Sequence, residues 1–362
     1  TLHADPRIDE YYWLNERENP KVIEYLEAEN AYREAVMKPS EDLQDELYRE
    51  IVGRIKQEDM SVPYFDNGYY YYSRYEKGRE YPIYGRKKES LEAEEEITLN
   101  VPEMAKGHDY YSVSGLNVSE NNQYIAFGVD TVSRRRYDIY FKDLQTGELL
   151  PEVLHNTSGY VVWANDNKTI FYTIKDETLR PYKLMRHVLG QDPANDVEVY
   201  HENDNTFYLG VGKSKTDKYI VIGSSHTLYT EYQLIEAAHP EKAPKTFLKR
   251  ERGHQYSIYH HVDKFYILTN WKAKNFRLMV TDEGKTDKKY WKEVIPLRDD
   301  VYLQNVTVFK DFLALGERKN GIRQLRVMNL KDQSDHYLDF DEESHVVYSL
   351  SLIHISEPTR LD

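Results

Sequence analysis

The sequence of 362 residues contains no cysteine, which excludes disulfide bonds and thiolate metal sites. It also lacks any apolar run of the roughly 18 residues that a membrane-spanning helix requires. Neither a His-Glu-x-x-His zinc motif nor a Gly-x-Ser-x-Gly nucleophile elbow occurs. From these absences we expect no metal, no cofactor and no membrane contact. A chain without cysteine fits the cytoplasm, and a periplasmic location stays open because the first residue is Thr1 rather than Met.

Basic residues are outnumbered, since 48 Lys and Arg face 62 Asp and Glu and give a formal net charge of −14. This balance argues against nucleic-acid binding, because that affinity comes from cations that neutralise phosphates. It is compatible with cationic peptide substrates, although solubility alone would also account for it. Tyrosine is abundant, with 33 copies against 11 phenylalanines, and it suits strands that have one end in the core and one end in water.

A short polar turn followed by an alternating apolar strand recurs along the chain. Five copies occur, at Asn117–Phe127, Val162–Tyr172, Gly212–Ile222, His261–Leu268 and Val308–Leu315. The turn residues favour hairpins, and the β-branched and aromatic residues that follow favour strands. Repeats of about 40–50 residues that each hold several strands are typical of propeller blades.

The spacing of this repeat predicts where the blades begin. A first blade starts with two strands around the turn Asp66-Asn67-Gly68. Later blades are expected to start near Tyr110, Thr157, Phe207, Gln255 and Val301, and a seventh near His345. A third strand also recurs, at Tyr137–Phe141, Tyr182–Met185, Tyr232–Ile235, Phe276–Met279 and Leu325–Met328. The predicted fold is all-β, a seven-bladed β-propeller over residues 62–350 that is truncated in its last blade.

Residues 1–61 have a different pattern and predict an N-terminal helical arm. Asn19 before Pro20 provides a helix N-cap followed by proline at the first helical position. Pro39 is expected to break this helix, and Ser40 is expected to cap a second one with an apolar stripe. At the other end, residues 351–362 abandon the blade pattern. They resemble a translated sequencing adaptor, so we expect a non-native tail and exclude it from the fold.

The densest basic cluster is Arg134-Arg135-Arg136, in a loop expected between the second and third strands of a blade. Such a cluster is commonly a solvated turn. The alternative is a charge clamp to a neighbouring acidic group, for which Asp109 and Asp130 are the candidates. Taken from the residues alone, the chain is a propeller with a helical arm and no catalytic set.

Four ordered segments resemble the prolyl oligopeptidase family of serine peptidases, and most closely its oligopeptidase B branch. They are Arg7–Leu14, Ser133–Tyr137, Val161–Asp166 and Thr269–Phe276. The similarity runs over residues 1–350 with the order of these landmarks kept.

The resemblance implies a propeller that caps an α/β-hydrolase domain, with the active site between the two. It implies serine-type hydrolysis of short peptides, after Arg or Lys in the oligopeptidase B branch, with the propeller selecting substrates by size. The Ser-Asp-His triad would then lie beyond the end of this chain, so the hydrolase domain is expected to be absent and the fragment inactive. The expected partners are that hydrolase domain and short cationic peptides. Asp109 is carried over as an interdomain residue that pairs with Arg134 or Arg135.

Two other functions stay open on the sequence. The chain could be a stand-alone propeller that binds peptides or proteins as a scaffold, or it could belong to a proline-specific member of the same family. The reading frame beyond residue 350 separates the scaffold from the peptidase. Acidic residues in the pocket of the hydrolase domain would then separate Arg/Lys specificity from proline specificity.

Overall fold

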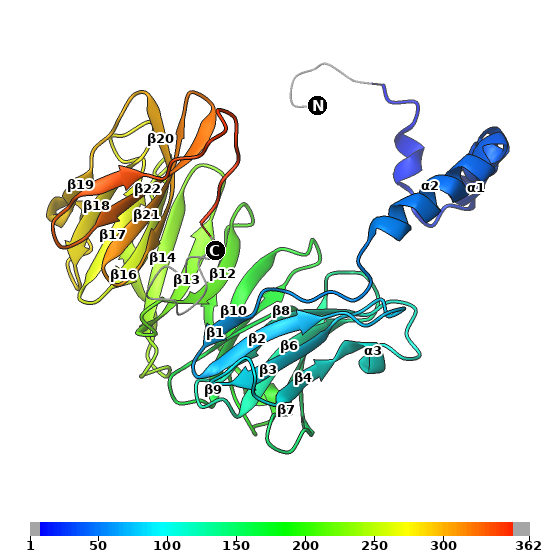
Figure 1. Cartoon of the computed structure of the whole chain (residues 1–362), viewed down its shortest axis with the longest axis horizontal. Helices are drawn as coiled ribbons and strands as arrows, with labels where there is room; N and C mark the ends of the chain where they lie inside the picture. Colours follow the sequence, from blue (N-terminus) through cyan, green and yellow to red (C-terminus); the bar gives the residue numbers. More distant parts are fainter. Residues whose placement is uncertain (1–7, 350–362) are drawn as a thin grey trace. The chain divides into compact units, whose positions relative to one another are not determined.

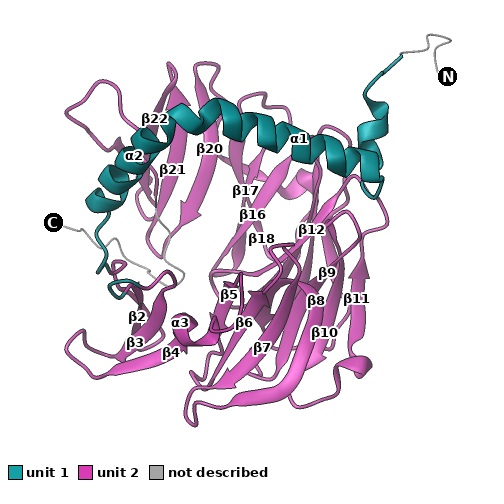
Figure 2. Cartoon of the chain, turned by 90° about the vertical axis from the view of Figure 1, so that its right-hand side faces the viewer, with its two compact units in different colours: residues 1–59, 76–78 teal, residues 60–75, 79–362 magenta. Residues whose placement is uncertain are grey.

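The computed structural model describes residues 8–349 and divides them between two compact units, coloured separately in Figure 2. The first unit comprises residues up to Asp59 together with Glu76–Gly78, and the second comprises Met60–Tyr75 and the residues from Arg79 onward. The expected tail, 351–362, lies outside the described residues. No helix in the described range is both long and apolar enough to cross a membrane.

The first unit is helical, as the sequence predicts. It contains a 3-10 turn (Tyr12–Asn15), α1 (Pro20–Met37), a second 3-10 turn (Lys38–Ser40) and α2 (Glu41–Arg54). The predicted cap of α1 is confirmed, because the Asn19 side chain accepts a hydrogen bond from the Lys21 N–H at 3.0 Å. The predicted cap of α2 is wrong. The chain continues through Pro39 as a 3-10 turn, and Ser40 Oγ donates to the Met37 carbonyl at 2.7 Å and accepts from the Gln44 side chain at 2.9 Å, so it bonds no backbone N–H of α2.

The second unit consists of antiparallel sheets, shown in chain order in Figure 1. The first sheet contains β1 (Tyr64–Asp66), β2 (Tyr69–Arg74), β3 (Ile83–Lys88) and β4 (Glu95–Asn100), followed by the short helix α3 (Val101–Met104). The second sheet contains β5 (Ser112–Val118), β6 (Tyr124–Asp130), β7 (Tyr137–Asp143), β8 (Leu149–Trp163), β9 (Thr169–Lys175), β10 (Pro181–Val188) and β11 (Val197–His201). The third contains β12 (Tyr208–Lys213), β13 (Tyr219–Ser225), β14 (Thr230–Glu236) and β15 (Lys245–Leu248). The fourth contains β16 (Tyr256–His261), β17 (Lys264–Thr269), β18 (Arg277–Asp282) and β19 (Lys292–Ile295). The fifth contains β20 (Val301–Val308), β21 (Phe312–Lys319), β22 (Ile322–Asn329) and β23 (Asp335–Tyr337).

The seven-stranded sheet holds two blades that share one strand. The 15-residue β8 pairs with β7 through its first half and with β9 through its second half. Counted this way, the described residues contain six four-stranded blades, each ordered first to fourth strand along the chain. The predicted propeller-like, nearly all-β fold is therefore confirmed, and every predicted third strand falls in the third position of its blade. Near His345, where a further blade was expected, residues 338–349 hold no assigned strand.

Apolar clusters lie between consecutive blades, as expected when sheets pack face to face. One cluster joins the blade of β8–β11 to that of β12–β15 through Phe171, Leu184, Ile220 and Ile222. Another joins the last two blades through Leu268, Leu278, Val306 and Leu315. Turn chemistry sets the register at the start of the propeller, where Asn67 and Gly68 adopt φ of +44° and +85° between β1 and β2.

Glycines allow an unusually close approach of the first and second strands of one blade to β8. Gly115 in β5 and Gly128 in β6 both lie against the backbone of Gly159 in β8, and a Cβ on Gly128 would lie 2.6 Å from Gly159 Cα. Gly115 and Gly159 also have φ of +64° and +86°, a region that favours glycine. The junction within the seven-stranded sheet thus depends on the absence of side chains at these positions.

A buried histidine in the loop before β16 makes stability depend on pH. His254 is 5% exposed, its Nε2 lies 2.9 Å from Thr269 Oγ1, and its Nδ1 has no hydrogen-bond partner. Burial, helped by the positive charge of Lys288, lowers the pKa of His254 to about 4. The unfolded chain, with a pKa near 6.5, therefore binds this proton more readily, and stability falls as the pH drops from about 6.5 towards 4.

We expect His254 to account for a loss of about 1 kcal/mol in the free energy of unfolding between pH 7 and pH 5.5. Urea unfolding at the two pH values measures it, and His254→Gln should reduce the pH dependence by that amount. His336→Gln, at an exposed position in β23, is the matched control and should leave it unchanged. Equal pH dependence in the wild type and the His254 variant would contradict the assignment.

Candidate functional site

The first strands of all six blades line one cavity of about 1040 Å³. The lining includes residues of β1, β5, the second half of β8, β12, β16 and β20. We call this cavity the channel. Because each blade contributes its innermost strand, the channel follows from the propeller topology itself, and its wall alternates channel-facing and core-facing residues.

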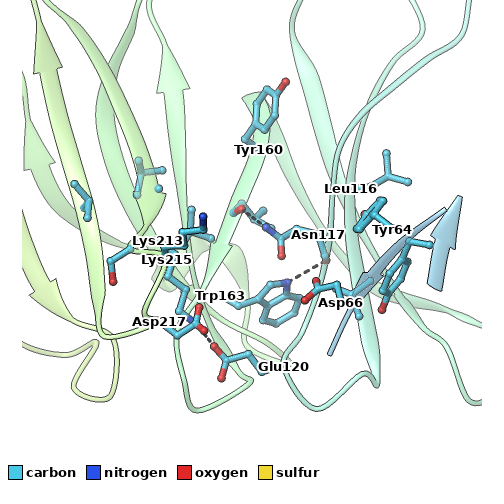
Figure 3. Close-up of a pocket in the computed structure, with 18 of the residues that line it drawn as sticks. Tyr64, Asp66, Leu116, Asn117, Glu120, Tyr160, Trp163, Lys213, Lys215 and Asp217 are labelled. Carbon is cyan, nitrogen blue, oxygen red and sulfur yellow. Dashed lines mark hydrogen bonds and ion pairs between the residues drawn. The ribbon is translucent and has the colours of Figure 1, made fainter. Parts of the chain in front are cut away.

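Tyrosines and charged residues dominate the polar part of the channel wall. The tyrosines are Tyr64, Tyr71, Tyr72, Tyr84, Tyr160, Tyr232 and Tyr259. The charged residues are Asp66, Glu120, Lys213, Lys215 and Asp217. Burial raises the pKa of Tyr64 to about 12, so this phenol stays protonated and can donate a hydrogen bond. Figure 3 shows Lys213, Lys215, Asp217 and Glu120 on one side of the view, Asp66 nearer to Tyr64, and Tyr160 apart from both.

The channel has two chemically different ends. The inner strands run in the same sense, so the turns that follow them meet at one end, which we call the hairpin end (turns 119–123, 164–168, 214–218 and 309–311). The loops between second and third strands lie at the opposite end, which we call the loop end (131–136, 176–180 and 270–276). The chain enters β1 at the loop end, since each antiparallel blade begins and finishes on that side.

The turn after β12 holds the hairpin end together by reaching three other blades. Lys213 makes an ion pair with Glu120 in the turn after β5, and this contact is drawn as a dashed line in Figure 3. Lys215 Nζ donates to the Val308 carbonyl at 2.9 Å and lies 4.1 Å from the Phe309 ring centroid. Asn165 donates to the Asp217 carbonyl at 3.0 Å. One turn therefore cross-links blades that are separated by about 90 residues of sequence, as in the Lys213–Glu120 pair.

A buried imidazole adds a fourth blade to this group. His260 in β16, with a side chain 1% exposed, bonds to Thr216 through Nδ1 and to Glu283 through Nε2. Glu283 also accepts from Lys218 at 2.6 Å. Burial lowers the pKa of His260, and the Glu283 carboxylate partly opposes that shift. The order hydroxyl, imidazole, carboxylate is that of a catalytic triad. Here, however, Thr216 belongs to the turn after β12 and Glu283 pairs with Lys218 of the same turn, so the three groups serve as a cross-link.

At the loop end, the contact between the predicted arginine cluster and Asp130 is a set of backbone hydrogen bonds and not an ion pair. Asp130 is 2% exposed and accepts backbone N–H bonds from Arg134 at 2.9 Å and Arg135 at 2.7 Å. It therefore orders the loop backbone and leaves the guanidinium groups of both arginines exposed. Asp109 is also exposed, three residues before β5, and within residues 8–349 it forms no ion pair with Arg134 or Arg135. The Asp109 pairing stays a prediction.

Sequence reasoning missed the Lys213–Glu120 and Lys215–Val308 contacts. The only available signal was that Gly212–Ile222 is a repeat copy whose turn is rich in lysine. Metal binding has no support in the described residues, which contain no group of three or more His, Cys, Asp or Glu side chains arranged to hold an ion.

Six blades around a tyrosine-lined channel with a charged end define a β-propeller domain. The sequence of residues 1–358 matches the family described as prolyl oligopeptidase, N-terminal beta-propeller domain. The chain belongs to the prolyl oligopeptidase family.

Similar proteins and a similar solved structure agree with this assignment. Dipeptidyl aminopeptidase BI of Pseudoxanthomonas mexicana is 40% identical over 97% of this chain and 50% of its own length. Protease 2 of Moraxella lacunata is 35% identical over 97% of this chain and 51% of its own length. The structure of oligopeptidase B from Leishmania major superposes with a TM-score of 0.87 at 27% identity, covering 93% of this chain and 49% of that one. The predicted resemblance to oligopeptidase B is confirmed, and the chain spans about half the length of these relatives.

Proposed function

We propose that the chain is the non-catalytic propeller part of a serine-type oligopeptidase that hydrolyses short peptides after Arg or Lys. In this proposal an α/β-hydrolase domain supplies the catalytic triad, and the propeller selects substrates by size. The observation that carries the proposal is the channel, whose hairpin end is crossed by the Lys213–Glu120 ion pair. A folded protein cannot thread such a passage, whereas its volume is at the upper end of the range for small-ligand sites and suits an extended short peptide.

Charge supports the preference for cationic peptides. The chain has a net charge of −14, and in the channel lining the three carboxylates of Asp66, Glu120 and Asp217 outnumber the two ammonium groups of Lys213 and Lys215. A surface with net negative charge raises the local concentration of cations and speeds their association. In the same proposal the exposed Asp109 contacts the hydrolase domain, and the exposed apolar residues Leu43, Leu47 and Ile51 of α2 pack against it.

The complete protein tests this directly. We expect hydrolysis of a short peptide amide with Arg at the cleavage site, weak hydrolysis of its Pro counterpart, and loss of activity with a serine-reactive inhibitor. Because one relative is named dipeptidyl aminopeptidase BI, a second candidate function is release of dipeptides from a free amino terminus. An N-blocked arginyl substrate separates the two, since only an endopeptidase cleaves it. If none of these substrates is hydrolysed, the proposal is wrong and the function as a binding scaffold is favoured.

The ion pair at the hairpin end gives a specific prediction about size selection. In the complete protein, Lys213→Ala should raise the relative kcat/KM for a peptide of about 30 residues over a tripeptide amide by about fivefold, because it removes a bond across the channel. The charge-reversed pair Lys213→Glu with Glu120→Lys should restore the wild-type ratio. Lys242→Ala removes an exposed ion pair with Glu236 away from the channel and is the matched control. An unchanged ratio in Lys213→Ala would show that size is not selected at this end.

A further inference from the structure

The loop Asp130–Arg136 at the loop end of the channel has a fixed backbone. The buried Asp130 carboxylate accepts three backbone N–H bonds, from Val132 at 2.9 Å, Arg134 at 2.9 Å and Arg135 at 2.7 Å. Ser133 and Arg135 adopt φ of +59° and +56°, which is unfavourable for residues with a side chain. Such conformations persist where the surroundings enforce them, and they concentrate at functional positions. We call this loop the arginine turn.

The arginine turn presents two cationic side chains that have no acidic partner in the described part of the chain. Arg134 and Arg135 are exposed, and neither forms an ion pair within residues 8–349. The neighbouring Arg136 differs, because it donates to Asn156 Oδ1 at 2.9 Å and so supports the turn. Elsewhere in the propeller, buried arginines have acidic partners, as Arg86 has Glu96 at 2.8 Å and Arg180 has Asp176 at 3.0 Å.

A third cation reinforces the positive charge of the turn. Lys175, at the end of β9 in the next blade, donates through Nζ to the Arg135 carbonyl at 2.5 Å. Burial lowers the pKa of Lys175 and the positive charge of Arg135 lowers it further, while the Asp130 carboxylate opposes these shifts. In a chain with net charge −14 this local excess of positive charge is a concentrated anion-attracting site.

The turn lies one strand away from the channel wall. Asp130, at the end of β6, is paired in register with Ser112, the first residue of the inner strand β5. Tyr160, which lines the channel, follows Gly159, and Gly159 packs against Gly115 and Gly128 of these same two strands. The described residues that line the channel include none of Asp130–Arg136, so the turn borders the loop end of the channel from one strand away.

We propose that Arg134 and Arg135 bind the C-terminal carboxylate of the peptide substrate. The inference rests on the proposed function, which places a short peptide in the channel. Guanidinium groups bind carboxylates through paired, charge-assisted hydrogen bonds, and a pre-ordered backbone lowers the cost of holding two of them together. A site for the free carboxylate at a fixed distance from the cleavage position would also favour peptides of limited length, whatever their sequence.

The test uses the complete protein and one short arginyl peptide prepared both as the free acid and as the C-terminal amide. For the wild type we expect a KM about tenfold lower for the acid than for the amide, and a smaller ratio at high salt, which screens exposed charges. The double variant Arg134→Gln with Arg135→Gln should raise the KM of the acid about tenfold and leave that of the amide unchanged. Arg252→Gln, an exposed arginine before β16, is the matched control and should change neither.

Three outcomes would overturn the inference. The wild type could have the same KM for the free acid and for the amide. The double variant could leave the acid-to-amide ratio unaltered. It could also raise both KM values equally, which would assign the arginines to a clamp with Asp109 or with the hydrolase domain. An N-blocked arginyl amide that ends in a fluorophore keeps this question apart from the proposed function, because its hydrolysis by the wild type shows the peptidase activity without any free carboxylate.

Discussion

Glu317→Gln is expected to lower the free energy of unfolding of the propeller by about 3 kcal/mol. Glu317 in β21 is fully buried and receives an ion pair from Arg298, a second from Arg326 at 3.5 Å, and a hydrogen bond from the Tyr337 hydroxyl at 2.6 Å. Removing this charge leaves the partly buried Arg298 without its counter-ion, whereas Arg326 keeps Asp335 at 2.6 Å. The cost of the uncompensated Arg298 charge exceeds the value of the lost bond itself. Urea unfolding measures the change.

The control for this variant is an exposed ion pair in the same sheet. Lys319 and Asp300 lie 3.3 Å apart with side chains 46% and 61% exposed. Asp300→Asn should cost less than about 1 kcal/mol, because water screens and replaces such contacts. Similar losses from the two variants would show that the Glu317 group is no stronger than a surface pair.

Gly115→Ala is expected to be the more damaging substitution, at about 3–5 kcal/mol. An added Cβ would overlap the carbonyl of Gly159, which belongs to the β8 backbone and has no flexible side chain to move aside. The same residue has φ of +64°, where alanine is strained. Both effects separate β5 from β8, so the variant should also lose order at Tyr160 and in the channel wall. Unfolding measurements and tyrosine fluorescence together test this.

Gly147→Ala separates the two causes. Gly147 has φ of +78°, but a Cβ there would meet nothing within 4 Å. It should therefore cost only the conformational strain, about 1–2 kcal/mol. If Gly115→Ala were no worse than Gly147→Ala, the close approach to Gly159 would have no energetic weight.

Most strands of this fold could be predicted because their signals are local. The turn Asp66-Asn67-Gly68 specifies a hairpin by its own chemistry, and the segments that contain Tyr137 and Tyr232 form third strands of their blades. The merging of two blades through β8 could not be predicted, since Leu149–Trp163 has the same alternation as two separate strands. Ser40 failed as a cap for a similar reason. Sequence shows that a residue can cap, but backbone geometry after Pro39 decides whether it does.

The site was less predictable than the fold because its contacts join distant parts of the chain. The cluster at Arg134 and Arg135 could be located from sequence, and Asp130 was among its candidate partners. The bond that forms runs to backbone N–H groups, however, and this depends on φ values that composition does not encode. Lys213 and Glu120 lie in two ordinary polar turns. Only closing the blades around a common channel brings them together.

The strand shared by two blades has a mechanical consequence. The strand β8 takes part in both ladders, although the register shifts along it, including between Thr157 and Val161, so these two blades are joined by backbone hydrogen bonds as well as by side chains. The other blades meet along seams of side chains and turns. Separating the two blades that share β8 would break ladder hydrogen bonds, whereas widening another seam only separates apolar surfaces. A bound peptide would therefore displace the channel wall least at β5 and β8. Outward displacement is expected on the side formed by β12, β16 and β20.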